Sequence, residues 1–385
     1  MDDFRALLDR FWVTRTGSKE LYFALKRAQP DYRRLVNELL GWNLIVNESV
    51  VKLEKVPPKA MPWMGIQSFQ EPMDYCLLCA VLLFLADLDN GAPFLLSSLT
   101  KAIETFLAEI KPVDWTQFLH RKSLVRVLQY AQEVGLVLAY DGNSAGFGSN
   151  QDQEVLYENT GLSRHFPVHF GRDIMGCRSI EDFEAFSWGG EDTESRRHRV
   201  YQQLTLAPGF YCSDENRSDY EYIKNQRRAV NASLDKALDG ELQIHKNGAF
   251  FLLSEGERCG MVYPGTRALS DVALLLCAQL RKQILQDVYP RREDDTVVLT
   301  RREFRYEIER CRAKWGNGWG SQMRAMSLDR IVQELTAYMS GWMLLEELED
   351  DILLYPAVGK LVGNYPASYQ NELNEEDEDG PLEDE

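Results

Sequence analysis

The thiols and imidazoles of this sequence are the first groups whose types and spacing could do chemistry. Cys76 and Cys79 have the spacing of half a zinc site, but no second pair follows, and structural zinc needs four converging ligands. His165 and His169 would share one face of a helix, yet Pro167 between them disfavours that helix. We therefore expect the two cysteines to pack as core residues, and we expect no metal at the histidines.

Two further segments have the composition of phosphate or metal sites but lack the residues that such sites need. The glycine-rich loop at 142–148 has no Gly-Lys-Ser/Thr ending, so it cannot act as a P-loop. We expect it to be the mobile tip of a wing, which is a loop between two strands. The carboxylates at 293–295 and 349–351 are typical of exposed turns. We therefore expect no catalytic residue and no cofactor. A metal-dependent hydrolase stays an open alternative, which a metal assay on the purified protein would test.

Basic residues point to nucleic acid, although the chain carries a formal net charge of −17. Affinity for DNA comes from Lys and Arg, so any contact must come from local patches. A helix of a small DNA-binding domain can enter the major groove of DNA. Contacts from such a helix to the phosphates position the domain but carry no base information. Ordinary surface charge is the alternative for each residue taken alone. The candidate DNA-binding residues are Arg121, Lys122, Arg126, Arg196, Arg197, Arg324 and Arg330.

Two tryptophans, Trp315 and Trp319, lie in a glycine-rich segment at 315–320. Tryptophan on a flexible loop is a common anchor for a partner protein, so both are candidate partner-binding residues. The alternative is that they cover the core of their own domain.

The elements that must position these side chains follow one order, used twice. An apolar helix leads to a short strand ending in Ser or Thr, then to two helices and a strand pair, which is the order of a winged helix. Ser97 and Thr300 are expected to cap the second helices, and Gly135 and Gly341 to end the third ones. The first copy has helices at 73–87 and 123–134 and strands at 94–97, 136–140 and 154–158; the second has helices at 270–288, 301–315 and 328–339 and strands at 297–300, 342–347 and 352–355.

The rest of the chain shows weaker patterns. Apolar spacing predicts helices at 3–12 and 18–40, with a kink or break at Pro30, and strands at 42–46 and 50–54. The section after the first copy is expected to hold a strand at 200–206, a helix at 219–238 and a hairpin turning at 246–248.

The expected fold class is therefore α+β and predominantly helical, with tandem winged-helix domains. The last fourteen residues hold nine acidic side chains, which is typical of a solvated tail. We expect an N-terminal helical region with a strand pair at 1–66, winged helices at 67–160 and 269–365, an intermediate α/β section at 161–268 and a disordered acidic tail at 366–385.

Composition also bears on where the protein works. No apolar run reaches the roughly 20 residues that span a bilayer, and we expect no secretory signal. Seven cysteines, an odd number scattered through predicted helices, fit reduced thiols. We expect a cytoplasmic protein with no membrane partner.

Several short motifs, in this order and spacing, resemble the KITE subunit (kleisin-interacting tandem winged-helix element) of Wadjet-type bacterial SMC defence systems. The resemblance covers most of the chain up to about residue 364, and the acidic tail lies outside it. The motifs are Lys-Val-Pro at 55–57, Asp-Tyr-Cys-Leu-Leu at 74–78, Ser-Leu-Val-Arg-Val-Leu at 123–128, Val-Gly-Leu-Val at 134–137, Asp-Gly at 141–142, Glu-Val-Leu-Tyr-Glu at 154–158, Ser-Arg at 163–164 and Leu-Leu-Tyr-Pro-Ala at 353–357.

The resemblance implies a dimeric, non-enzymatic subunit that docks on a kleisin. In that family the kleisin bridges the heads of an SMC ATPase, a separate nuclease subunit cuts, and the condensin-like complex extrudes DNA loops and restricts plasmids. The implied partners are thus a kleisin, an SMC ATPase reached through the kleisin, a nuclease subunit, a second copy of this chain, and DNA without sequence specificity. The alternative is a stand-alone winged-helix transcriptional regulator, which would bind an operator by itself at roughly nanomolar affinity.

Overall fold

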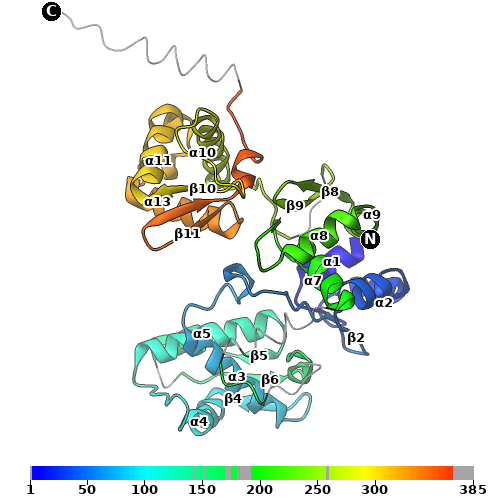
Figure 1. Cartoon of the computed structure of the whole chain (residues 1–385). Coiled ribbons are helices and arrows are strands. Elements are labelled where there is room, and N and C mark those ends of the chain that lie inside the picture. Colours follow the sequence, from blue (N-terminus) through cyan, green and yellow to red (C-terminus); the bar gives the residue numbers. More distant parts are fainter. Residues whose placement is uncertain are drawn as a thin grey trace, which may run out of the picture. The chain divides into compact units, whose positions relative to one another are not determined.

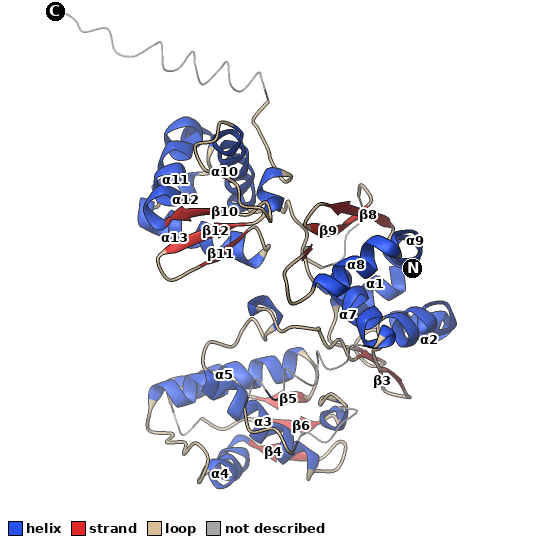
Figure 2. Ribbon diagram, in the orientation of Figure 1, coloured by secondary structure: helices blue, strands red, loops and turns tan. Residues whose placement is uncertain are grey.

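The computed structural model describes residues 2–142, 144–150, 153–169, 175–179, 182, 192–256 and 260–366. The fold class is α+β: helices surround small three-stranded antiparallel sheets, four of them in the described part of the chain (Figures 1 and 2). The chain divides into two compact units, Met1–Arg199 and Val200–Glu385. None of the described helices combines the length and the apolar character needed to cross a bilayer. The predicted acidic tail lies, from residue 367 on, outside the described residues.

The first unit opens with a small helical region, here called the first small copy. Its π-helix ends before Gly41, whose φ of +63° suits glycine. Of the kink or break predicted at Pro30, the break is absent, since α2 continues through this residue to Arg34. The elements are α1 (Asp2–Asp9), β1 (Val13–Thr14), α2 (Lys19–Arg34), the π-helix Leu35–Leu39, β2 (Leu44–Val46) and β3 (Val50–Leu53), with sheet order β1-β3-β2.

A buried lysine on β3 fastens the first small copy to a distant segment of the same unit. Lys52 is 1% exposed, and its Nζ donates to the carbonyl oxygens of His165, Phe166 and Pro167 at 2.8, 2.8 and 3.0 Å. The same amine lies 3.7 Å from Glu54 Oε1. A buried ammonium needs such partners, so Lys52 acts as a clamp on residues 165–167.

The first large copy follows and has the predicted order of elements. Its sheet order is β4-β6-β5, so the strand before the second helix pairs with the last strand, Phe94 opposite Tyr157. Trp12 and Val50 of the first small copy join its core. The elements are α3 (Pro72–Ala86), β4 (Pro93–Leu95), α4 (Leu96–Leu107), α5 (Phe118–Glu133), β5 (Val137–Asp141) and β6 (Leu156–Asn159), with 3₁₀ turns at Pro62–Met64, Ser144–Gly148 and Leu162–His165.

The described part of the glycine-rich loop is folded back on its domain, rather than being the mobile tip that we predicted. The turn Ser144–Gly148 buries Phe147, which is 3% exposed and meets Trp115 edge-on with ring centroids 5.9 Å apart. An apolar side chain inside the loop therefore holds it against the domain core.

The second small copy opens the second unit, although its first helix begins in the first unit at Thr193. The strand predicted at 200–206 is wrong: these residues end a helix, α7, and Val200 and Leu204 are buried at helical spacing. The predicted helix at 219–238 is two helices, and the predicted hairpin is present. The elements are α7 (Thr193–Leu206), β7 (Phe210–Tyr211), α8 (Arg217–Asn225), α9 (Arg227–Leu238), β8 (Gly240–His245) and β9 (Gly248–Leu253), with sheet order β7-β9-β8.

The second large copy completes the unit, and the bounds predicted for β10 and α11 are confirmed. Its sheet order is β10-β12-β11, with Leu299 opposite Ile352. Phe250 of β9 joins its core. The elements are α10 (Ala268–Leu285), β10 (Val297–Thr300), α11 (Arg301–Trp315), α12 (Ser321–Ala325), α13 (Leu328–Gly341), β11 (Leu345–Glu347) and β12 (Asp351–Leu354), with 3₁₀ turns at Gly316–Gly318 and Pro356–Gly359.

The helix ends match the predicted caps in only two of four places. Thr300 caps α11 in a capping box with Glu303, and Gly135 takes the expected positive φ of +81° after α5. Ser97 is not a cap, because it lies in the first turn of α4, where its backbone N–H donates to Glu154 Oε1 at 3.0 Å. Gly341 is the last residue of α13, and Met343 takes the positive φ beyond it.

All four copies thus share one strand order, in which the third strand lies between the first two. Each has a leading helix, a short strand, one or more helices and a hairpin. The sequence pattern predicts only the two large copies, since the strands β1 and β7 are two residues long.

Candidate functional site

Arg126 does not face solvent on the third helix of the first large copy, as a DNA contact would. Its Nε and Nη2 donate to Asp74 Oδ2 and Oδ1, both at 2.8 Å, and Nη2 also donates to Ser123 Oγ at 3.0 Å. The side chains are 12% and 0% exposed. Arg126 therefore joins α5 to α3, and the prediction of a DNA contact is corrected to a buried ion pair.

The charge of Asp74 is fixed by this pair and by its place at the start of α3. Burial alone would raise its pKa, but hydrogen bonds from Arg126 and from the backbone N–H of Gln70 outweigh burial and hold the pKa below its ordinary value. Asp74 also belongs to a capping box with Glu71. The carboxylate is thus part of the fold and has no free oxygen in reach of solvent.

Arg121 and Lys122, at the start of α5, have different surroundings. The guanidinium of Arg121 donates to the backbone carbonyl oxygens of Trp115, Thr116 and Gly148, at 2.6, 2.8 and 3.3 Å. It therefore holds the folded loop in place. Lys122 is exposed, so it keeps the position that a phosphate contact requires.

In the second large copy the predicted basic residues lie on the surface. Arg324 is exposed on α12. Arg330 is exposed on α13, where its Nε donates to Glu334 Oε1 at 2.8 Å. Both remain accessible to an anionic partner, because an exposed ion pair of this kind contributes little free energy.

The remaining basic candidates, Arg196 and Arg197, lie half-buried on α7. Arg197 Nη2 is 3.6 Å from Glu194 Oε1. Both side chains are therefore less accessible to a phosphate than that of the exposed Lys122.

The two candidate anchor tryptophans are core residues. Trp315 is 7% exposed and Trp319 is 4% exposed, and both belong to the core of the second large copy. Lys314 Nζ lies over the Trp315 ring, 4.3 Å from its centroid. The prediction of a partner anchor is therefore wrong, and the alternative of a covered core holds.

The cysteines and histidines that have metal-ligand spacing in the sequence have other surroundings in the structure. Cys76 is half-buried and Cys79 exposed on α3, both as free thiols. His169 Nδ1 lies 2.8 Å from Glu54 Oε1, while His165 Nε2 lies 3.2 Å from Asn47 Nδ2. Within the described ranges, no group of three or more His, Cys, Asp or Glu side chains converges as a metal site would require.

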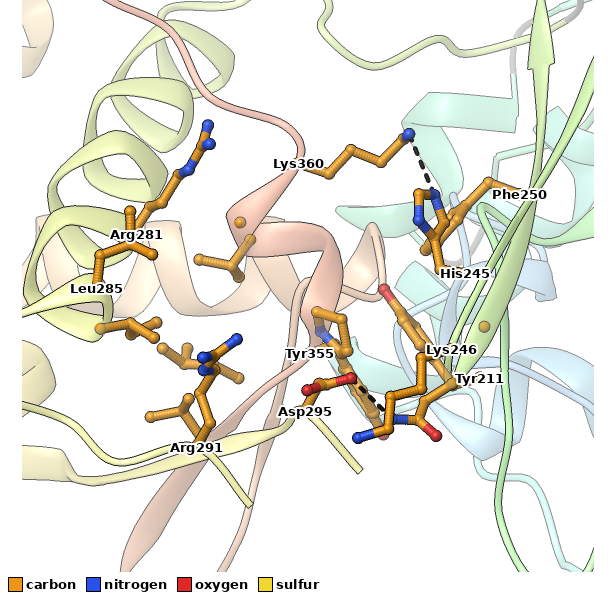
Figure 3. A pocket seen from close by; sticks show the side chains of 18 residues that line it. Tyr211, His245, Lys246, Phe250, Arg281, Leu285, Arg291, Asp295, Tyr355 and Lys360 are labelled. Atoms are coloured by element: carbon orange, nitrogen blue, oxygen red, sulfur yellow. Dashed lines mark hydrogen bonds between the residues drawn. The ribbon is translucent and has the colours of Figure 1, made fainter. Parts of the chain in front are cut away.

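A feature not predicted from the sequence is a pocket in the second unit, with a cavity volume of about 390 Å³ (Figure 3). It is lined by the β8–β9 turn, the end of α10 and the turn after β12. Figure 3 shows Arg281 and Arg291 on one side, and Lys360 and His245 on the other. On its floor Tyr211 stacks on Tyr355, with ring centroids 4.4 Å apart.

The side chains that line this pocket carry a net positive charge. Four lysine and arginine side chains line it against one carboxylate, Asp295. Lys360 Nζ lies 3.3 Å from His245 Nε2, and burial together with this amine lowers the pKa of His245, so its imidazole is neutral at pH 7. Asp295 Oδ2 accepts from Asn247 Nδ2 at 2.8 Å. The pocket is therefore suited to an anion.

Comparison with known proteins gives a family. Residues 4–364 match the family described as "Protein of unknown function (DUF2398)". The chain belongs to the DUF2398 family. A search among curated proteins finds no match for this DUF2398 chain. The family description assigns no activity, so the function of the chain must be argued from its geometry.

No motif in the sequence predicts the pocket of this DUF2398 protein. Arg281, Arg291 and Lys360 are separated by up to 79 positions and come from a helix end and two turns. None belongs to a motif.

Proposed function

We propose that this chain is a non-catalytic KITE subunit, which binds the kleisin of an SMC-type loop-extruding complex and helps that complex engage DNA in defence against plasmids. The observation that carries the proposal is the order of elements in the two large copies. Each places its first strand against its third strand, with two main helices between the first and second strands. This order supports the proposal, because a winged helix has the same succession of elements, and its tandem use agrees with the resemblance in the sequence.

The polar interior of the large copies supports a scaffolding role. Asp74 is bonded to Arg126, and the buried Glu307 accepts from Gln279 Nε2 and Tyr289 Oη at 2.6 and 2.9 Å. Each buried carboxylate is therefore engaged in holding helices together. A general acid or base needs a carboxylate within reach of a substrate, and these two lie in the core.

Surface cations support a limited role in DNA contact. Lys122, Arg324 and Arg330 are exposed, whereas Arg121 and Arg126 are engaged by the fold. Few contacts on an acidic chain give weak, non-specific affinity. Such affinity fits a subunit that contacts DNA only within a larger complex.

The test is co-expression of the full chain with the proteins encoded beside it, followed by tagged purification and mass measurement. We expect a stoichiometric assembly with a kleisin and an SMC protein that contains two copies of this chain. The chain alone should show no ATPase or nuclease activity. A chain that purifies without any of these neighbours would contradict the proposal, and tight binding of one operator by the isolated chain would then favour a regulator.

A control keeps loss of folding separate from loss of docking. The exposed Arg302→Ala variant should assemble as the wild type does, because the side chain lies on the surface of α11. Asp74→Asn weakens the core of the first large copy, so any assembly that it loses should be accompanied by a lower unfolding midpoint.

A further inference from the structure

The positive pocket of the second unit has the size of a small-ligand site. Its cavity of about 390 Å³ falls in the range of about 300–1,000 Å³ that such sites occupy. Ile284, Val297 and Val358 supply apolar wall, while the cations lie around it (Figure 3). A ligand held there would be partly removed from water, which strengthens its polar contacts.

The cations of the pocket are not neutralised by the protein. Lys246 Nζ donates to the backbone oxygen of Glu293 at 3.1 Å, and Lys360 Nζ donates to Gln243 Oε1 at 2.5 Å. Within the described part of the chain, the side chains of Arg281 and Arg291 make neither an ion pair nor a hydrogen bond. The pocket therefore keeps an excess of three positive charges on a chain whose net charge is −17.

This excess selects the chemical class of the ligand. A single carboxylate carries one negative charge and would leave most of the cations without a partner. A phosphoryl group carries up to two charges and accepts the paired N–H groups of a guanidinium. A diphosphate or triphosphate therefore matches the pocket better than a carboxylate does.

The apolar wall selects what the phosphate is attached to. A water molecule occupies about 30 Å³ of liquid, so a phosphate alone leaves most of the cavity unfilled. The flat ring of a nucleobase would cover the apolar part of the lining, to which Ile284 and Val358 belong. We propose that this pocket binds a phosphorylated nucleoside, with Arg281, Arg291 and Lys360 holding its phosphoryl oxygens.

The phosphorylated nucleoside has two sources, a free nucleotide or the end of a nucleic-acid strand. Isothermal titration calorimetry of the purified full chain with ADP, pyrophosphate, adenosine and a 5′-phosphorylated single-stranded oligonucleotide separates them. We expect ADP to bind more tightly than pyrophosphate and adenosine. Tighter binding of ADP than of the oligonucleotide assigns a free nucleotide, and the reverse order assigns a strand end.

Variants test the residues. Arg281→Ala and Arg291→Ala should each weaken ADP binding by about tenfold, which corresponds to about 1.4 kcal/mol. Both side chains are exposed, so the fold should persist, as circular dichroism would check. The matched control Arg302→Ala should bind ADP as the wild type does.

Three results would overturn the inference. They are no heat with any of the phosphorylated compounds, equal affinity for ADP and pyrophosphate, and unchanged ADP affinity in the Arg281→Ala, Arg291→Ala double variant. The inference goes beyond the proposed function and does not depend on it. Its test uses the chain alone, whereas that of the proposed function measures assembly with neighbouring proteins.

Discussion

The two large copies share one order of elements but bury their carboxylates in different places. In the first, Asp74 on the leading helix pairs with Arg126 on the third helix. In the second, Glu307 on the second helix accepts from Gln279 on the leading helix and from Tyr289 after it. The shared topology is therefore compatible with two polar interiors, one built on an ion pair and the other mainly on neutral donors.

This difference determines which cations remain for a partner. The first large copy uses Arg121 and Arg126 on its third helix to hold its own loop and leading helix. The second leaves Arg330 exposed on its third helix, with Arg324 exposed nearby in the sequence. A basic residue on a third helix is thus no guide to DNA contact until its carboxylate partner is known.

The largest expected effect comes from breaking the ion pair of the first large copy. Arg126→Ala leaves the Asp74 carboxylate buried without its partner, so we expect a loss of about 3–5 kcal/mol in the free energy of unfolding. Urea denaturation measures it. The matched control, Arg330→Ala, removes an exposed pair and should cost less than about 1 kcal/mol. Equal losses in the two variants would contradict the assigned role of Arg126.

A smaller loss is expected when the carboxylate of the second large copy is made neutral. Glu307→Gln keeps the shape of the side chain but places an amide N–H₂ group next to other hydrogen-bond donors. We therefore expect a loss of about 1–3 kcal/mol in the free energy of unfolding. Its cationic partner, Arg310, is 44% exposed and can turn to water. Urea denaturation of Glu307→Gln and Arg126→Ala gives the two losses in the free energy of unfolding. A larger loss for Glu307→Gln than for Arg126→Ala would contradict the predicted order.

The pH dependence should show the ion pair directly. The folded-state pKa of Asp74 is lowered, so its contribution is complete above the unfolded pKa of about 3.9 and is lost as pH falls through the folded value. Wild-type stability should therefore fall below about pH 4 more steeply than that of Asp74→Asn. Urea midpoints across this range test the prediction, and parallel curves would contradict it.

The caps of the second helices give a further, smaller contrast. Thr300→Ala removes a side-chain cap and should cost about 0.5–2 kcal/mol. Glu154→Ala should have the same direction but a smaller effect, because this carboxylate caps α4 from an exposed position. Thermal denaturation of the two variants is the measurement. A greater loss at Glu154 would mean that this carboxylate, which precedes β6, is the stronger cap.

The smallest effects concern DNA. Lys122→Ala, Arg324→Ala and Arg330→Ala should each weaken binding to duplex DNA uniformly across sequences and reduce the salt slope by about 1. Arg302→Ala serves as the surface control. Fluorescence anisotropy over a salt series measures the slope. A change confined to one DNA sequence would point to base contact and to the regulator hypothesis.

Long, strongly patterned elements could be predicted from the sequence. The capping box of Thr300 and Glu303 follows an apolar strand, so the start of α11 was found at its residue. The helix around Val200 could not be predicted, because its short run of Val, Tyr, Leu and Thr also fits a strand. The helix signal was Asp192, which accepts from the backbone N–H groups of Glu194 and Ser195 and starts α7.

Candidate site residues were harder to predict, because their roles depend on distant partners. Asp74 and Arg126 are 52 positions apart, and a single sequence does not show that they meet. Trp315 and Trp319 lie beside glycines, which suggested an open loop, yet tertiary packing buried both rings. The exposed fraction of a side chain is a property of the folded surface, and spacing in the sequence alone does not give it.

The Lys52 clamp has a consequence for synthesis on the ribosome. The carbonyl oxygens that accept from this amine lie 113–115 positions further along the chain. At roughly 5–20 residues per second, they emerge about 6–23 seconds after Lys52 does. We expect the nascent N-terminal region to keep this lysine hydrated during that interval, so that its sheet closes only after the first large copy has been made.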